Sequence, residues 1–266
     1  LIPAKTATFS TPVTYLFPRI CRSIALRGNQ VGLDGRHTMV HQRAMVGAVL
    51  VAVLSVAAMR LHKRDDLQPP HFELVLSSAL LDRVVANYAD SFGKDADPYR
   101  NHCLRVLSYS KYFLRRDFGF DDNQVEAAMP VMEAALAFHD IGLWSDRKMD
   151  YLDVSSRRAV LDLKSEEEGF SEDDLILVSN IIEQHHKVTD WQGPGQNIVN
   201  AVRKGDWVDA SMGFVRHGMP LAHITSANEA IPNLSFHAIL GSLGSKLHPG
   251  IKNLPARLSI LRIFKW

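Results

Sequence analysis

From about residue 73 onward, apolar residues recur at steps of three and four, the spacing of an amphipathic helix. No segment shows a convincing alternation of apolar and polar residues, and the sequence contains no internal repeat. The sequence therefore predicts an all-α fold, with helices over residues 73–92, 97–116, 121–140, 171–186 and 197–211.

Local signals refine these helices. Asp97 followed by Pro98 is typical of an N-cap and a first helical residue. Ser171 and Asp174 have the spacing of a capping box. Pro130 lies inside the segment 121–140, and we expect it to kink or divide that helix because proline lacks the backbone N–H.

The first part of the chain differs from this pattern. Residues 1–43 carry several lysines and arginines against a single acid, Asp34, and show no sustained periodicity. Such a segment buries too little apolar surface to order itself, so we expect a disordered leader. An organelle transit peptide and an untranslated stretch before a start at Met39 are the alternatives.

Residues 44–59 are uncharged, and basic residues follow them up to residue 64. As a helix this run covers about 24 Å, so it spans a hydrocarbon layer of about 30 Å only with bilayer thinning or snorkelling flanks. We expect residues 44–64 to form a membrane anchor, with a cleaved signal peptide or a buried soluble helix as alternatives. Basic residues flank both ends of the run; if the protein starts at Met39, those after it favour a cytoplasmic domain. Without the anchor, the protein would be cytoplasmic or secreted.

Prolines and acids in residues 65–72 indicate a linker, which leaves residues 73–266 as the helical domain. The formal net charge of +1 gives no sign of a nucleic-acid surface. Cys21 and Cys103 lie far apart in segments of different character and build neither a disulfide framework nor a Cys-rich zinc site. Any bound metal therefore depends on imidazole and carboxylate groups, and the chain has 12 histidines.

His139 and Asp140 stand side by side where the apolar stretch "AALAFHDIGLW" ends. A histidine at a helix C-terminus is commonly a cap, but an aspartate there meets the negative end of the helix dipole and needs a positive neighbour. A metal cation would serve, because His102 and Asp206 lie among apolar residues of other predicted helices and can face inward. Mixed imidazole and carboxylate ligands suit a divalent Zn, Fe, Mn or Ni ion.

The order His102, His139-Asp140, Asp206 resembles the H…HD…D signature of the HD-domain superfamily of metal-dependent phosphohydrolases. The match covers residues 97–210. The resemblance implies a compact helical domain in which these four residues bind one metal ion, and Asp140 also orients a water.

His185 and His186 end the helix at 171–186 and are candidates to bind a second ion or the substrate. Because consecutive helical residues point about 100° apart, we expect only one, His185, to face the site and act with Asp140 in catalysis. The alternative is a polar helix end. Lys187 stands where the cyclic-di-GMP-cleaving branch has a glutamate, and di-iron oxygenases of the superfamily space their extra histidines apart. The compact branch that includes cyanamide hydratase is the most similar.

Three basic residues lie near the ligands in sequence and are candidates to bind an anionic substrate, although solvated helix faces often carry such residues: Arg105, Lys187 and Lys204. Asp209 follows Asp206 by one helical turn and is a candidate to orient a metal-binding histidine.

These features predict a metal-dependent hydrolase that directs activated water at a small-molecule substrate, a phosphate ester or nucleotide. A hydratase or amidohydrolase of a nitrile-like substrate would use the same chemistry. The non-catalytic alternative is a metal-binding helical domain that serves as a sensor or interaction module.

Overall fold

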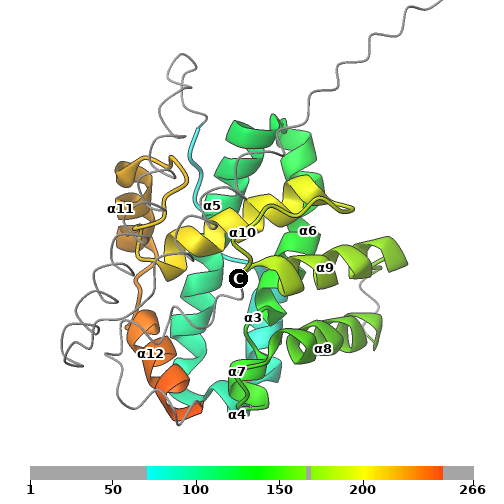
Figure 1. The fold of residues 1–266 in the computed structure, drawn as a ribbon, viewed down its shortest axis with the longest axis vertical. Helices are drawn as coiled ribbons and strands as arrows, with labels where there is room; N and C mark the ends of the chain where they lie inside the picture. Colours follow the sequence, from blue (N-terminus) through cyan, green and yellow to red (C-terminus); the bar gives the residue numbers. More distant parts are fainter. Residues whose placement is uncertain (1–70, 166–168, 248–266) are drawn as a thin grey trace, which may run out of the picture. The chain divides into compact units, whose positions relative to one another are not determined.

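The structure is a computed structural model that describes residues 71–165 and 169–247, all within the unit from Arg64 to Trp266. Helices form in these ranges without any β-strand, which confirms the all-α prediction for this part of the chain (Figure 1). The elements are α3 (Ala79–Asn87), α4 (Ala89–Phe92), the 3-10 turn η1 (Gly93–Asp95), α5 (Ala96–Phe118), α6 (Asp122–Phe138), α7 (Gly142–Ser145), α8 (Leu152–Ser165), α9 (Glu172–Gln184), α10 (Gln196–Ala210), α11 (Leu221–Ala230) and α12 (Phe236–Leu247).

The leader predicted for residues 1–43 and the anchor predicted for residues 44–64 lie outside the described residues, as do the last residues of the predicted domain. Among the helices that the structure does describe, none combines the length and the apolar character that crossing a bilayer requires.

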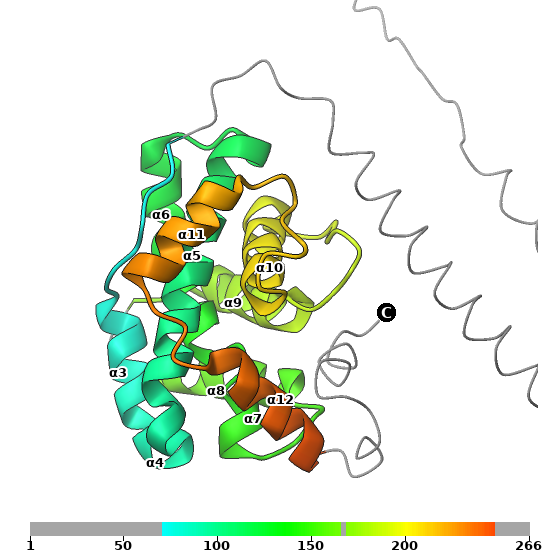
Figure 2. The same ribbon diagram turned by 90° about the vertical axis from the view of Figure 1, so that its left-hand side faces the viewer.

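Helix α5 is the centre of the domain. Its side chains are buried on nearly every face from Pro98 to Leu114. Helices α10 and α6 make the most extensive contacts with it, and α9 packs against α6, α8 and α10 (Figures 1 and 2). Because α10 and α6 both pack on this long central helix, their positions are fixed relative to it and to each other.

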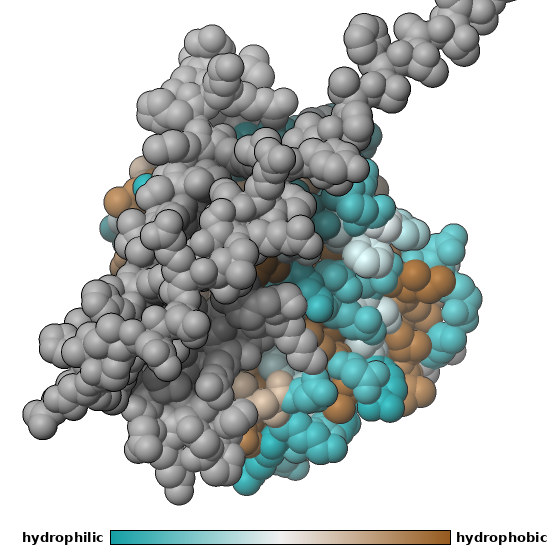
Figure 3. Space-filling view, viewed as in Figure 1, coloured by the Kyte–Doolittle hydropathy of each residue, from teal (hydrophilic) through white to brown (hydrophobic). Residues whose placement is uncertain are grey.

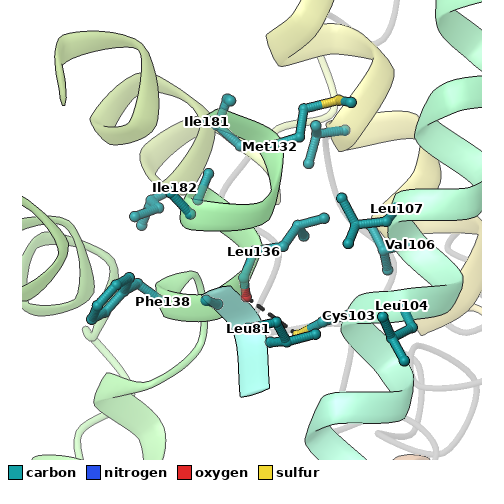
Figure 4. Close-up of a cluster of buried hydrophobic side chains, with 14 of the residues drawn as sticks. Leu81, Cys103, Leu104, Val106, Leu107, Met132, Leu136, Phe138, Ile181 and Ile182 are labelled. Atoms are coloured by element: carbon teal, nitrogen blue, oxygen red, sulfur yellow. Dashed lines mark hydrogen bonds between the residues drawn. The ribbon is translucent and has the colours of Figure 1, made fainter. Parts of the chain in front are cut away.

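The core between α5, α6 and α9 is apolar and closely packed. Figure 4 shows side chains from these helices and from α3 meeting there, among them Leu81, Leu104, Leu107, Met132, Leu136, Ile181 and Ile182. Each is at most 1% exposed, and full burial of such a side chain stabilises the fold by about 1.5–3 kcal/mol. This packing fixes where α6 and α9 end relative to α5.

The first described helix begins later than its periodicity predicts. Residues 71–78 are not helical, and α3 starts at Ala79 because the Ser78 hydroxyl caps it by accepting a hydrogen bond from Leu81 N–H. Upstream, Val75 N–H donates to the Ser108 hydroxyl of α5 at 2.9 Å, and Phe72 stacks on His223 of α11. The segment before the cap therefore runs extended along the helices (Figure 2). Phe72, Leu74 and Val75 pack against the core, whereas Leu76 is exposed.

The other helix signals have mixed outcomes. The capping box of Ser171 with Asp174 is confirmed at the start of α9. The predicted start of α5 is wrong by two residues, because its N-cap is Asp95 and Pro98 lies within the first turn. Helix α6 runs unbroken through Pro130, so the proline does not divide it.

On the face in Figure 3, the described surface over α8 and α9 carries hydrophilic residues with apolar patches between them. Leu161 of α8 and Ile176 of α9 are exposed large hydrophobic residues of these helices. Scattered apolar residues of this kind are normal on a protein surface.

Two helices approach each other most closely at Gly205 of α10. A Cβ atom at this position would lie 2.8 Å from the Ser110 hydroxyl oxygen and 2.9 Å from the Val106 carbonyl oxygen of α5. A glycine inside a helix costs about 1 kcal/mol relative to alanine, so its presence here indicates that the close approach is needed. The next residue, Asp206, is thereby held against α5.

Candidate metal centre

Four chain segments bring histidines and aspartates together in the interior. Helix α5 supplies one histidine, the residues after α6 and after α9 supply two adjacent residues each, and α10 supplies an aspartate. Their ligand atoms form overlapping groups of three in which all atoms lie within 4.8 Å of one another. Each of the six residues is at most 5% exposed: His102, His139, Asp140, His185, His186 and Asp206.

Two of the imidazoles are oriented by the helices that precede them. His139 Nδ1 lies 2.7 Å from the Leu136 carbonyl oxygen, and His185 Nδ1 lies 2.6 Å from the Ile182 carbonyl oxygen. A carbonyl oxygen only accepts, so each Nδ1 carries a proton and donates it. In the neutral ring the lone pair is then on Nε2, which faces the cluster.

The Leu136 carbonyl is a shared acceptor. It also receives hydrogen bonds from the Cys103 thiol at 3.2 Å, drawn in Figure 4, and from the Tyr99 hydroxyl at 3.0 Å. The aromatic ring of Tyr99 stacks on the imidazole ring of His139. The end of α6 is therefore tied to α5 at the residues that precede His139 and Asp140.

His102 is oriented by a carboxylate instead of a carbonyl. Its Nδ1 lies 2.7 Å from Asp209 Oδ2, which leaves Nε2 facing the cluster. Arg105 holds Asp209 through two hydrogen bonds, from Nε at 2.6 Å and from Nη2 at 2.8 Å. Burial opposes the charge of Asp209, but Arg105 and His102 outweigh it and lower the pKa of the carboxyl group. Asp209 thus stands behind His102, where a carboxylate orients a ligating histidine.

Helix α12 completes the wall beside His102. Phe236, which is fully buried, stacks on the His102 ring with centroids 4.2 Å apart, and His237 Nε2 lies 2.7 Å from the Asp209 carbonyl oxygen. The sequence alone did not indicate that α12 lies beside the site. An aromatic residue at the start of a helix gives no local sign of what it packs against.

The distances between ligand atoms suit a common ion. His102 Nε2 lies 3.1 Å from His139 Nε2 and 3.3 Å from Asp206 Oδ1, and His139 Nε2 lies 3.3 Å from Asp140 Oδ2. Two ligands at about 2.1 Å from one ion are about 3.0 Å apart at a right angle and about 3.4 Å apart at a tetrahedral angle. Two imidazole lone pairs facing each other at 3.1 Å also repel unless a cation or a proton lies between them.

Several buried atoms at the same place have no hydrogen-bond partner: Asp140 Oδ1, His185 Nε2 and Asp206 Oδ2. A buried polar group without a partner costs about 1–3 kcal/mol, and more when it is charged. All three are electron-pair donors, and a divalent cation would satisfy them together. The described residues therefore fit a transition-metal ion with mixed nitrogen and oxygen ligands.

The charges of the cluster support the same interpretation. Burial opposes ionisation of Asp140, but His139 and the other histidines outweigh it and hold the pKa of that carboxyl well below its usual range. The pKa of His139 is raised because Asp140 outweighs the effect of burial. Burial and the neighbouring His186 lower the pKa of His185 to about 4, so this ring is neutral at pH 7 and keeps its lone pair.

The structure places both His185 and His186 beside Asp140, and not His185 alone. Their Nε2 atoms lie 3.4 Å and 3.6 Å from Asp140 Oδ1. His185 is the C-cap of α9 and keeps right-handed helical backbone angles, yet the His185 and His186 rings lie with centroids 3.7 Å apart. A step of about 100° per residue therefore does not turn the second ring away from the site.

Tyr151, at the start of α8, is a buried residue of the site that sequence reasoning missed. Its hydroxyl lies 2.5 Å from His186 Nε2. Gly142 explains why it can come so close, because a Cβ there would lie 2.9 Å from Tyr151 Cβ and 3.0 Å from its carbonyl oxygen. The glycine after His139 and Asp140 is required for packing against α8.

The three basic residues that are candidates to bind the substrate differ in the partners that their side chains contact. Arg105 is committed to Asp209 and to the carbonyls of the α11–α12 connection, so it supports the ligands from behind. Lys204 Nζ pairs with Asp117 at 2.8 Å. Lys187, directly after the histidine pair, makes no ion pair with any acid in the described ranges.

Neither the protein-family models nor the curated proteins compared with this sequence give a match. The described domain is all-helical and carries a buried histidine and aspartate cluster that can hold a metal ion, which is compatible with an HD-type fold.

Proposed function

We propose that this protein is a metal-dependent hydrolase of the HD type. His102, His139, Asp140 and Asp206 would hold one divalent Zn, Fe, Mn or Ni ion. The observation that carries the proposal is the convergence of oriented imidazole lone pairs with buried carboxylate oxygens that lack partners. When bound there, such an ion supplies an activated water at neutral pH, because it lowers the pKa of water from about 16 toward about 7.

The residues of the chain would then divide the remaining work. Asp140 presents Oδ2 to His139 and leaves Oδ1 without a hydrogen bond, so Oδ1 can accept a hydrogen bond from the attacking water and orient it. His185 is neutral and its Nε2 has no partner, so it can accept a hydrogen bond from a substrate hydroxyl or bind a second ion. The low exposure of all these groups excludes bulk water from the reaction.

A phosphate ester or nucleotide is the first substrate class, in keeping with the resemblance to phosphohydrolases. Lys187 is the candidate cation that remains available to its anionic oxygens. The second candidate is a small neutral substrate such as a nitrile, for hydration or amide hydrolysis. A neutral substrate is favoured because Arg105 is already paired with Asp209 and Lys204 with Asp117. A neutral substrate needs no additional cation.

The test uses the full chain, purified and analysed for bound metal. It is then assayed with Zn, Fe, Mn or Ni on a panel of phosphoesters and on cyanamide and small nitriles. We expect Asp140→Asn to lose turnover with every substrate that the wild-type protein accepts. Asp173→Asn, at an exposed carboxylate in the first turn of α9, is the matched control and should retain full activity.

Stoichiometric metal without turnover on any substrate would favour the sensor or interaction module. A wild-type chain that binds no ion, or full turnover by Asp140→Asn, would refute the assigned centre.

A further inference from the structure

The hydrogen bond between Tyr151 and His186 occupies one side of the cluster. Tyr151 is 1% exposed, and its hydroxyl oxygen lies 2.5 Å from His186 Nε2. The two rings are nearly perpendicular, with an interplanar angle of 89° and centroids 6.0 Å apart. The phenol therefore points its hydroxyl in the plane of the imidazole, where the Nε2 lone pair or its proton lies.

The consequence for His186 does not depend on its tautomer. If Tyr151 donates, the lone pair of Nε2 is used by the hydrogen bond. If His186 donates, Nε2 carries a proton and has no lone pair to offer. In both cases Nε2 cannot ligate an ion while the hydrogen bond exists.

The main chain around Tyr151 holds the phenol in place. The Tyr151 carbonyl accepts from Ser155 N–H at 2.8 Å, and the Ser155 hydroxyl accepts from Gly142 N–H at 3.0 Å. Since a Cβ at Gly142 would meet Tyr151, the two chain segments already touch. Tyr151 is thus fixed relative to the segment that carries Asp140, and not only to His186.

His186 is otherwise placed to help bind a second ion. Its Nε2 lies 3.6 Å from Asp140 Oδ1, the oxygen that faces away from His139, and His185 Nε2 lies 3.4 Å from the same oxygen. Ligand atoms of His185, His186 and Asp206 also lie within 4.8 Å of one another. In this arrangement the hydrogen bond with the Tyr151 phenol engages His186 Nε2.

We propose that Tyr151 is a positioning residue that keeps His186 Nε2 from binding a second ion, so that the chain holds one ion at His102, His139, Asp140 and Asp206. The inference rests on the metal centre proposed above. Its consequence is a choice of chemistry, because one ion activates a single water whereas two ions clamp both reacting oxygens of a phosphoryl transfer. Tyr151 therefore favours reactions that need a single ion.

The experiment removes the hydroxyl and counts ions. The full chain is freed of metal with a chelator and titrated with Zn²⁺ alone, with stoichiometry from calorimetry and elemental analysis. We expect one zinc ion in the wild-type chain, two in Tyr151→Phe, and one again when His186→Ala is added to that variant. Tyr109→Phe is the matched control, because Tyr109 is fully buried and its hydroxyl has no hydrogen-bond partner.

A second measurement uses the wild-type chain and does not depend on how the variants fold. Nitrogen-15 spectra of the histidine side chains are recorded during the zinc titration. We expect His102 and His139 to shift to metal-bound values at one equivalent, while His186 Nε2 keeps the shift of a hydrogen-bonded nitrogen.

The outcomes separate the two proposals. Two zinc ions in the wild-type chain, one in Tyr151→Phe, or a metal-bound His186 Nε2 at one equivalent would overturn the role of Tyr151 and leave the metal centre intact. A wild-type chain that takes up no zinc would overturn the centre itself.

Discussion

Replacing Asp209 with asparagine separates its contribution to stability from its contribution to metal binding. The substitution keeps the volume of the side chain but removes the charge that Arg105 Nε and Nη2 contact at 2.6 Å and 2.8 Å. Arg105 is fully buried, so its guanidinium would lose its counter-charge in the interior. Breaking a buried ion pair costs about 3–5 kcal/mol, which for a domain of this size lowers the melting temperature by about 6–20 °C.

The same substitution should weaken metal binding through His102. Asparagine replaces the carboxylate oxygen at 2.7 Å from His102 Nδ1 with a neutral amide oxygen, a weaker acceptor that Arg105 also contacts. The tautomer with the lone pair on Nε2 is then fixed less strongly. Loss of such a partner typically reduces metal affinity about 10–100-fold, or about 1.4–2.7 kcal/mol. The two effects are measured by thermal unfolding of the metal-free chain and by a zinc titration against a competing chelator.

A double variant, Arg105→Met with Asp209→Leu, distinguishes the two roles. Removing both charges and refilling the space should return most of the stability, because a buried ion pair is often no better than apolar packing. Zinc affinity should stay low, since a leucine side chain gives His102 Nδ1 no acceptor. Recovery of zinc affinity together with stability would refute the reasoning, because Asp209 would then act on the metal site only through the fold.

Two further predictions follow from the same geometry. Gly205→Ala should lower the free energy of unfolding by about 1–3 kcal/mol despite the better helix propensity of alanine, because the new Cβ meets Ser110 and the Val106 backbone. Urea unfolding measures this change, and a more stable variant would contradict the close approach. Zinc affinity should fall as pH drops from about 8 to about 6, because His102 and His139 have a pKa above the usual value of about 6.5 and protons compete for their Nε2 atoms. A raised pKa also means that these rings stabilise the metal-free fold most at low pH, so across the same range the metal-free chain should lose stability as pH rises while the zinc-loaded chain gains it. Thermal unfolding of both forms checks the sign, and parallel curves would contradict it.

The candidate ligands could be selected from the sequence because their order resembles the H…HD…D signature and because they lie next to or within apolar helices. His139 and Asp140 at the end of α6 are an unfavourable pair without a cation, and His102 and Asp206 interrupt apolar faces of α5 and α10. The helices themselves follow from periodicity and from caps such as Ser171, which are local signals.

Contacts between distant segments could not be predicted in the same way. Tyr151 meets His186 across 35 residues of sequence, and Arg105 meets Asp209 across 104. No periodicity distinguishes a tyrosine that reaches a histidine from one that packs in the core. The extended segment before Ser78 escaped prediction for a related reason, since its apolar residues fit a helix until the Ser108 hydroxyl competes for the backbone N–H of Val75.

The carbonyls of Leu136 and Ile182 orient His139 and His185 through bonds that form as the helices fold. The ligand geometry is therefore assembled before any ion arrives, and the metal-free and loaded forms should superimpose. Because the candidate ligands lie on described helices or directly after them and are buried, the rate of uptake should depend on how quickly an ion reaches the site. The site would behave as a rigid receptor, selecting ions by size and preferred coordination instead of adapting to each one.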